Sequence, residues 1–207
     1  MHCMRVLPIN TFEAEPWIVR RHYAKRMPSI SYSFGLYEDG LLTGVCTFGM
    51  PASPFLCMGV CGKDNKDIVI ELNRLCVESK TRNATSFLVS RSLKMLPRPM
   101  IVVSYADTAQ NHVGYIYQAC NFLFTGTTKE RTDMAGKEGG HSRHNKGDRT
   151  NRIDRSAKHR YIFFVGNRFE KKNLREQLMY PVMDFPKGDT KRYNASAEVP
   201  IQKMLFT

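Results

Sequence analysis

A short buried-type segment that runs directly into polar residues is the feature of this sequence that most constrains its fold. Residues Met100 to Val103 are apolar and rich in β-branched side chains, which is typical of a strand covered on both faces. Such strands occur in α/β sheets, where ligands bind beyond the carboxyl ends of the strands. Asp107 follows at that end, so the sequence predicts an α/β fold with a polar site beside Asp107.

A tyrosine follows this strand at a spacing that brings it back to the same place. Residues 108–112 are too polar for a core, and residues 113–120 have the pattern of one short helix of roughly two turns. Because helical side chains lean toward the helix N-terminus, Tyr117 should point over the turn that holds Asp107. An acid and a phenol that face one cleft can handle a proton. The alternative is that Asp107 caps the helix and Tyr117 is a core tyrosine.

The remaining chain alternates between strand and helix patterns. Two alternating runs flank Asp39-Gly40, which is a strong hairpin signal. Residues 49–66 contain several prolines and glycines, which predicts a loop. We expect strands over residues 5–9, 31–37, 41–48, 67–77, 122–128 and 161–165, and helices over 11–26, 83–96 and, briefly, up to 179.

Two segments carry further candidate chemistry. Glu71 and Arg74 interrupt the apolar strand 67–77, which indicates either a buried ion pair or a bulge that aims side chains into a cleft. Residues 79–83, at the start of the next predicted helix, bring hydroxyls, cations and free backbone amides together, as an anion site requires.

The charge of the chain favours a polyanionic partner. The formal net charge is +12, and residues 131–160 hold nine Lys or Arg against four Asp or Glu. We expect this stretch to be a basic loop that contacts nucleic-acid phosphates, with an extended tail from residue 181. A basic surface that serves only solubility is the alternative.

Nothing in the sequence indicates secretion or a membrane. No segment approaches the roughly 18 to 20 consecutive apolar residues that span a bilayer, and the N-terminus lacks an apolar signal region, so we expect a cytoplasmic protein. The six cysteines lie in predicted strands, helices and one loop, as reduced core thiols do, and a zinc site at Cys57 and Cys61 is a minor alternative.

The order of the predicted elements is similar to the GNAT acyltransferase fold. That resemblance implies a mixed, mostly antiparallel central sheet with helices on both faces, plus the basic loop and the extended C-terminal tail. In this fold the fourth and fifth strands splay apart around the acyl donor. Here the splayed pair would be residues 67–77 and 100–107.

A narrower set of motifs resembles the Mom family of bacteriophage DNA-modification proteins. The motifs are His22-Tyr23, Glu71-Leu-Asn-Arg74, Arg82-Asn83, Ser104-Tyr-Ala-Asp107, Gly114-Tyr-Ile-Tyr117-Gln-Ala-Cys-Asn121-Phe, Arg160-Tyr-Ile-Phe-Phe and Phe185-Pro-Lys187. They occur in the order of the family, and the Ile-Tyr-Gln-Ala-x-Asn-Phe run is the most specific. The resemblance implies an enzyme that converts adenine in double-stranded DNA to a carbamoylmethylated adenine and protects phage DNA from host restriction.

The resemblance also implies the residues of the site. The catalytic set would be His22, Tyr23, Asp107 and Tyr117, and His22, Tyr23 and Asp107 would be the ligands if iron is used. An acyl-CoA-type donor is the other candidate, bound by Glu71, Arg74, Arg82, Asn83, Ser86 and Ser104. DNA would be held by Arg21, Lys25, Arg143, Lys146, Arg149, Arg152, Arg155 and Lys158. Residues 80–86 lack the glycines of the usual GNAT pyrophosphate loop, which leaves the donor open.

These observations lead to one hypothesis and two alternatives. We expect a single catalytic domain over residues 1–180, an adenine-modifying transferase with either Asp107 or Tyr117 as the proton acceptor, and a second copy of the chain as a candidate partner. One alternative is a GNAT enzyme that acylates a protein or a small amine. The other is a basic DNA-binding protein without catalytic activity.

Overall fold

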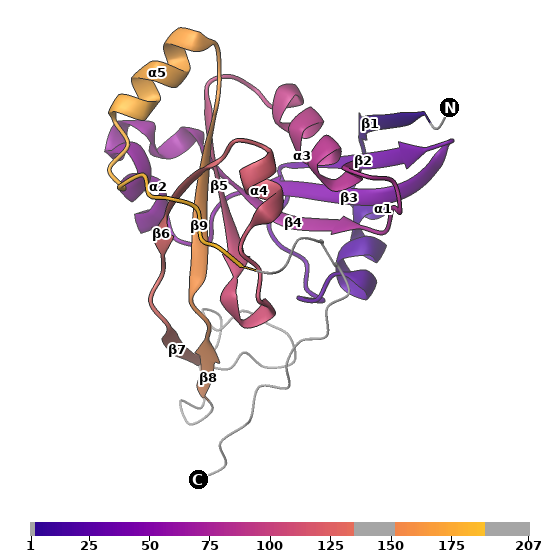
Figure 1. Cartoon of the computed structure of the whole chain (residues 1–207), viewed down its shortest axis with the longest axis horizontal. Coiled ribbons are helices and arrows are strands. Elements are labelled where there is room, and N and C mark those ends of the chain that lie inside the picture. Colours follow the sequence, from indigo (N-terminus) through magenta and orange to yellow (C-terminus); the bar gives the residue numbers. More distant parts are fainter. Residues whose placement is uncertain (1–2, 135–151, 189–207) are drawn as a thin grey trace.

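The computed structural model describes residues 3–134 and 152–188. Within these ranges seven strands form one mixed sheet in the order β1-β2-β3-β4-β5-β9-β6, where β4 and β5 are the parallel pair (Figure 1). The strands are β1 (Met4–Pro8), β2 (Tyr32–Glu38), β3 (Leu41–Gly49), β4 (Val69–Val77), β5 (Met100–Asp107), β6 (Leu123–Thr127) and β9 (Lys158–Val165). The predicted mixed, mostly antiparallel sheet is therefore confirmed.

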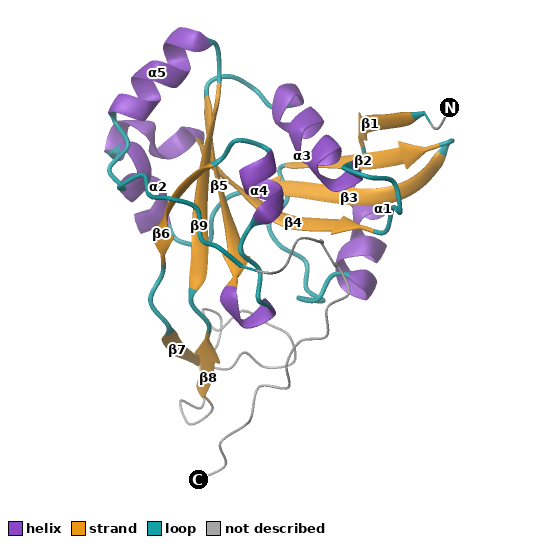
Figure 2. Cartoon of the chain, in the orientation of Figure 1, coloured by secondary structure: helices purple, strands orange, loops and turns teal. Residues whose placement is uncertain are grey.

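Helices cover both faces of this sheet (Figure 2). On one side lie α3 (Ala84–Met95) and α4 (Tyr115–Ala119), and on the other lie α1 (Thr11–Pro16), α2 (Pro54–Cys61) and α5 (Arg168–Glu176). Alternation along β5 separates the two cores, because Val102 packs with α3 whereas Ile101 and Val103 pack with α2 and α5. Both faces of β5 are buried, as its apolar pattern predicts.

The β2–β3 hairpin forms at the predicted turn. Asp39 has φ +49° and Gly40 has φ +87°, which are the left-handed conformations that a tight two-residue hairpin needs. The strands then continue in register from Glu38 opposite Leu41 to Tyr32 opposite Phe48, with one irregularity. The prediction of two antiparallel strands here is confirmed.

The predicted helix over residues 11–26 is wrong in its second half. The α-helix ends at Pro16 and is followed by a π-helical turn, Trp17–Arg21, that closes with a hydrogen bond from the His22 amide to the Trp17 carbonyl at 3.0 Å. Proline has no N–H to donate and crowds the preceding turn, which favours such an irregularity. His22 itself is extended, with φ −76° and ψ 136°. His22 and Tyr23 therefore belong to a loop rather than to a helix.

The predicted loop over residues 49–66 is also wrong. It contains α2 and a 3-10 helix, Lys63–Ile68. Pro54 stands at the start of α2, where a missing N–H costs no hydrogen bond, so here it begins a helix rather than breaking one. Cys57 and Val60 of α2 are buried against the sheet.

The ends of the predicted basic loop pair with each other. β7 (Arg131–Met134) and β8 (Arg152–Arg155) form a separate two-stranded ribbon, and β9 begins at Lys158. The prediction of one loop over residues 131–160 is therefore wrong at both ends, and residues 135–151 lie outside the described residues. Of the predicted tail, residues 181–188 pack on the sheet, because the Met183 amide donates to the Phe124 carbonyl at 2.9 Å.

Two expectations about the environment of the chain can be compared with the described residues. All five cysteines other than Cys3 are buried and free, as predicted for core thiols. In the described ranges, every helix is too short or too polar to cross a membrane.

Candidate active site

The site lies where β4 and β5 part. Their parallel pairing runs from Val69 opposite Ile101 to Leu72 opposite Ser104, and then both strands continue without pairing to each other. At the last pair the Ser104 hydroxyl, which is fully buried, donates to the Leu72 carbonyl at 3.0 Å. Ser104, predicted to bind the cofactor, thus ties the two strands together at the point where they separate.

A β-bulge in β4 turns two charged side chains toward this opening. Arg74 pairs with Thr47 and Leu72 pairs with Phe48, so Asn73 is an extra residue in β4. The Asn73 side chain stabilises the bulge by donating to the Ser29 carbonyl at 2.8 Å and accepting from the Thr47 hydroxyl at 2.7 Å. Of the two sequence alternatives the structure shows the bulge. No ion pair joins Glu71 to Arg74 among the described residues.

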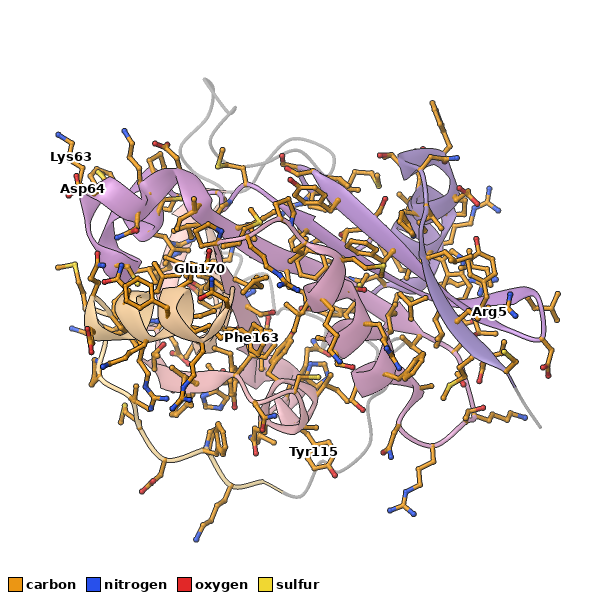
Figure 3. All side chains as sticks on the ribbon, turned by 90° about the horizontal axis from the view of Figure 1, so that it is seen from above. Arg5, Lys63, Asp64, Tyr115, Phe163 and Glu170 are labelled. Carbon is orange, nitrogen blue, oxygen red and sulfur yellow. The ribbon has the colours of Figure 1, made fainter. Side chains whose placement is uncertain are left out.

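Beyond the parting lies a cavity of about 140 Å³. Its walls come from four segments: the loop after the π-helical turn, the bulge of β4, the end of β5 with the start of β9, and the turn leading into α4. Its lining is His22, Tyr23, Glu71, Leu72, Asn73, Arg74, Leu75, Tyr105, Ala106, His112, Val113, Gly114, Tyr115, Ile116, Tyr117 and Lys158. Tyr115 lies at the edge of the molecule in Figure 3 and is about half exposed.

His22 and Tyr23 reach the cavity because Arg74 fixes the loop that carries them. The Nε and Nη2 atoms of Arg74 donate to the Arg26 carbonyl at 3.2 and 3.0 Å. The rings of His22 and Tyr23 stack with centroids 4.4 Å apart. Arg74, predicted to bind the cofactor, therefore holds the loop that carries His22 and Tyr23.

The environment of His22 keeps its imidazole neutral. Burial lowers the pKa of His22 to about 3, with further contributions from the positive charges of Arg74, His112 and Lys158. The Nδ1 atom accepts a hydrogen bond from the Ala24 amide at 3.1 Å, so the single proton of the neutral ring is on Nε2. His22 is thus a hydrogen-bond donor at Nε2.

This shift makes a pH-dependent contribution to stability that can be measured. Below pH 6.5 the unfolded chain takes up a proton on His22 that the folded protein does not, so stability is lost as the pH falls from 6.5 toward 3. The His22→Gln variant lacks this proton uptake. We expect the difference in unfolding free energy between the two proteins to narrow by about 1 to 2 kcal/mol between pH 7 and pH 5 in urea titrations. A constant difference would contradict a neutral His22.

The two phenols of the predicted catalytic set are also uncharged. Burial, with the negative charge of Asp107 next in size, raises the pKa of Tyr23 to about 12. Burial likewise raises the pKa of Tyr117, although a hydrogen bond with Ser104 opposes the shift. At neutral pH both groups carry their protons, so each can donate a hydrogen bond to a bound molecule.

Glu71 is the carboxylate that lines the cavity. Burial raises its pKa, and the charges of Arg74 and Lys158 limit the rise. Within the described chain its carboxylate has neither a hydrogen bond nor an ion pair, so its oxygens remain available to a bound molecule. An acid with a raised pKa in a cavity is the usual environment of a general base.

Asp107 lies just behind the cavity wall rather than in it. Its Oδ1 accepts from the Ala109 amide at 3.0 Å and from the Ser156 hydroxyl at 2.5 Å, and its Oδ2 lies 3.4 Å from Lys158 Nζ. It caps the 3-10 turn Thr108–Gln110, not α4 as the alternative from sequence had it. Three of the four predicted catalytic residues thus line one cavity, and Asp107 acts on it through Lys158 and its own charge. The catalytic roles themselves remain predictions.

The other predicted binding residues lie elsewhere. Arg82, Asn83 and Ser86 stand at the start of α3 and do not line the cavity. Of the predicted DNA contacts, Arg21 forms an ion pair with Glu78 at 2.6 Å, Lys25 is exposed and Lys158 lines the cavity. Arg152 and Arg155 lie in β8, while Arg143, Lys146 and Arg149 are outside the described residues.

The predicted iron ligands do not fit a metal site. Nδ1 of His22 already accepts a backbone hydrogen bond, and both oxygens of Asp107 are engaged by donors. In the described part of the chain, no group of three His, Cys, Asp or Glu side chains is placed to hold a metal ion.

Sequence reasoning missed His112. Its ring lies edge-on to Tyr23, with centroids 6.3 Å apart, and burial lowers its pKa while the charge of Asp107 opposes that shift. Its backbone amide donates to the Asp107 carbonyl at 3.1 Å. The spacing of five residues from Asp107 was the available signal, but the segment was interpreted only as a polar turn.

The strand order and the parting of β4 from β5 define a GNAT-like fold. Similar solved structures include an acetyltransferase of the GNAT family from Bacillus cereus, with a TM-score of 0.45, 14% identity, and coverage of 78% of this chain and 97% of that one. Another is YncA of Salmonella typhimurium with its cofactor acetyl-CoA, with a TM-score of 0.49, 11% identity, and coverage of 81% and 97%.

The sequence defines the family. A model of the Mom protein family matches residues 3–187, so the chain belongs to this family. Methylcarbamoylase mom of Escherichia phage Mu is 28% identical to it over 209 residues, which covers 89% of this chain and 84% of that protein.

Proposed function

We propose that this protein is a phage DNA-modification enzyme that transfers a carbamoylmethyl group to the exocyclic amine of adenine and so protects DNA from restriction. Membership of the Mom family, with a relative named methylcarbamoylase, supports the kind of group transferred. The net charge of +12 supports a nucleic-acid substrate. The observation that carries the proposal is the cavity between β4 and β5, where His22, Tyr23 and Tyr117 meet beside Glu71.

The cavity suits a planar ring. Aromatic side chains form much of its wall, and the Tyr23 ring contacts the rings of both His22 and His112. Enzymes that act on a base inside duplex DNA rotate it out of the stack and hold it by aromatic stacking and hydrogen bonds. A volume of about 140 Å³ matches the apolar cavity of about 150 Å³ that holds one benzene in a known case, so a purine would fill it and extend through its mouth.

Glu71 is the group that takes the proton in this proposal. As the amine nitrogen forms its bond to the carbon of an activated carbamoylmethyl donor, the bond from that carbon to its leaving group breaks. The amine proton passes to the Glu71 carboxylate. The protonated phenols of Tyr23 and Tyr117 and the Nε2–H of His22 donate hydrogen bonds that orient the adenine. Asp107 supports this arrangement by holding Lys158 and Ser156.

The donor is proposed only by class. A coenzyme A conjugate that carries the carbamoylmethyl group through its methylene carbon would lie between β4 and β5 with its phosphates toward the start of α3, near Arg82 and Asn83, and the coenzyme A thiolate would be the leaving group. Ser86 is less suited, because its hydroxyl donates to the Asn83 carbonyl at 3.0 Å. Titration of coenzyme A with the Arg82→Ala variant as a comparison tests this placement.

Nucleosides from the DNA of a host that expresses the protein test the function. We expect mass spectrometry to show a new deoxyadenosine whose mass is raised by one carbamoylmethyl group, and to show none in the host without the protein. The Asp64→Asn variant, changed at an exposed site in the 3-10 helix before β4, should give the wild-type amount. Unmodified DNA in the presence of folded, abundant protein would contradict the proposal.

A further inference from the structure

A second hollow adjoins the cavity. It has a volume of about 490 Å³ and brings together the turn after β5, the start of β9 and the end of the 181–188 segment. Its lining is Thr108, Asn111, His112, Val113, His159, Lys187 and Gly188. We call it the Lys187 groove.

The lining of the Lys187 groove is suited to an anion. Lys187 is its charged side chain at neutral pH, because burial lowers the pKa of both His112 and His159, and no carboxylate lines it in the described chain. The remaining polar groups are hydroxyl, amide and imidazole. One ring nitrogen of His159 is engaged with the Thr127 hydroxyl at 2.8 Å. A single exposed cation among hydrogen-bonding groups is a typical phosphate contact.

The groove and the cavity are continuous at one wall. His112 and Val113 line both of them. A nucleotide that is rotated out of a duplex carries its sugar and phosphate to the mouth of the pocket that takes the base. The groove lies next to the cavity that would take the base, since the two share His112 and Val113.

We propose that the Lys187 groove binds the DNA backbone phosphate next to the adenine held in the cavity, with Lys187 as its cationic contact. This inference rests on the proposed function. It adds a contact with the backbone phosphate, which would fix the position of the adenine in the cavity. Phosphate contacts of this kind position a nucleic acid without reading its sequence.

The 181–188 segment is held closely enough to place Lys187. Its Phe185 ring stacks on the buried Tyr161, with centroids 6.5 Å apart, and the Met183 amide is bonded to β6. Gly188 packs against Val113 so tightly that an added Cβ would overlap the valine side chain. This close approach brings the backbone beside Lys187 onto the wall shared by the two hollows.

Binding of short single-stranded oligonucleotides tests the groove without requiring catalysis. One oligonucleotide has a single adenine and normal linkages, and a second has an uncharged methylphosphonate in place of the phosphate beside that adenine. We expect the wild-type protein to bind the second roughly tenfold more weakly, and the Lys187→Ala variant to bind both with that same weaker affinity. The Lys63→Ala variant, which removes an equal charge from an exposed site, should behave as the wild type does.

Each outcome decides the inference. The groove does not hold this phosphate if Lys187→Ala binds the oligonucleotides with wild-type affinity. The same conclusion follows if the losses of binding free energy caused by Lys187→Ala and by the methylphosphonate add in full. If Lys187→Ala weakens the binding of coenzyme A and leaves the affinity for both oligonucleotides unchanged, the groove holds a phosphate of the donor and the inference is wrong. The proposed function is tested separately by the search for a modified nucleoside. It is wrong if no modified nucleoside forms, even if Lys187→Ala and the methylphosphonate have the expected non-additive effect on binding.

Discussion

Replacing Glu71 with glutamine is expected to slow adenine modification by roughly 10² to 10⁴-fold, the usual contribution of a general base. Glutamine has nearly the same shape but cannot take up the proton of the amine. Because burial raises the pKa of Glu71, the wild-type rate should fall as the pH drops through that raised pKa, and this acid limb should be absent from the residual activity of the variant. Rates are measured as modified deoxyadenosine formed with time in purified DNA.

Two comparisons make this result specific. Glu176→Gln removes an exposed carboxylate of α5, whose pairing with Lys172 is long and solvated, and should leave the rate unchanged. Asp107→Asn should also lower the rate, since it loosens Lys158 and Ser156, but it should keep the acid limb that belongs to Glu71. If Glu71→Gln retains the wild-type rate while Asp107→Asn abolishes it, Asp107 is the proton acceptor, which is one of the two candidates that the sequence left open.

Replacing Gly114 with alanine is expected to destabilise the fold by about 2 to 5 kcal/mol. Gly114 has φ +73°, which costs an L-residue about 1 to 2 kcal/mol, and an added Cβ would overlap the ring of Tyr161. That ring is fully buried and cannot move away, because its hydroxyl donates to the Val113 carbonyl and it packs against Tyr117 and Phe124. The measurement is the urea midpoint or the melting temperature.

A second glycine separates the two causes. Gly40 also has a positive φ, +87°, but an added Cβ there would meet nothing within 4 Å. Gly40→Ala should therefore show the conformational cost alone, about 1 kcal/mol. Equal losses of unfolding free energy in the two variants would mean that the Tyr161 ring moves to make room for the added Cβ. The contact between Gly114 and Tyr161 would then not fix the start of α4.

Local patterns were sufficient for most of the fold. The strands of the seven-stranded sheet, the Asp39-Gly40 turn and the helix over residues 84–95 depend on short-range alternation, turn chemistry and helical spacing, and they were predicted within a few residues. Two of the wrong predictions concern helices that contain proline, a residue that can either begin a helix or interrupt one. Pro16 lies inside a helix and Pro54 begins one, and only packing against the sheet decides which applies.

The site was predicted in part. The motifs identified His22, Tyr23, Glu71 and Tyr117, and all four line the cavity. The direction of Arg74 could not be predicted, because the bulge at Asn73 changes the alternation of β4 after Leu72. Hydrophobic pattern does not reveal a bulge of this kind, whose hydrogen bonds go to residues 29 and 47, far away in the sequence.

The sequence by itself determined the α/β class, the hairpin, the buried strand that ends in Asp107, and the motifs of the Mom family. These depend on interactions between residues close together in the chain or on residue identity alone. The tertiary structure decided that Glu71 lines the cavity, that Asp107 stands behind it, and that Lys187 reaches the hollow beside it. The physical reason is that each of these positions is fixed by hydrogen bonds and close packing between segments distant in sequence, which only the folded chain brings together.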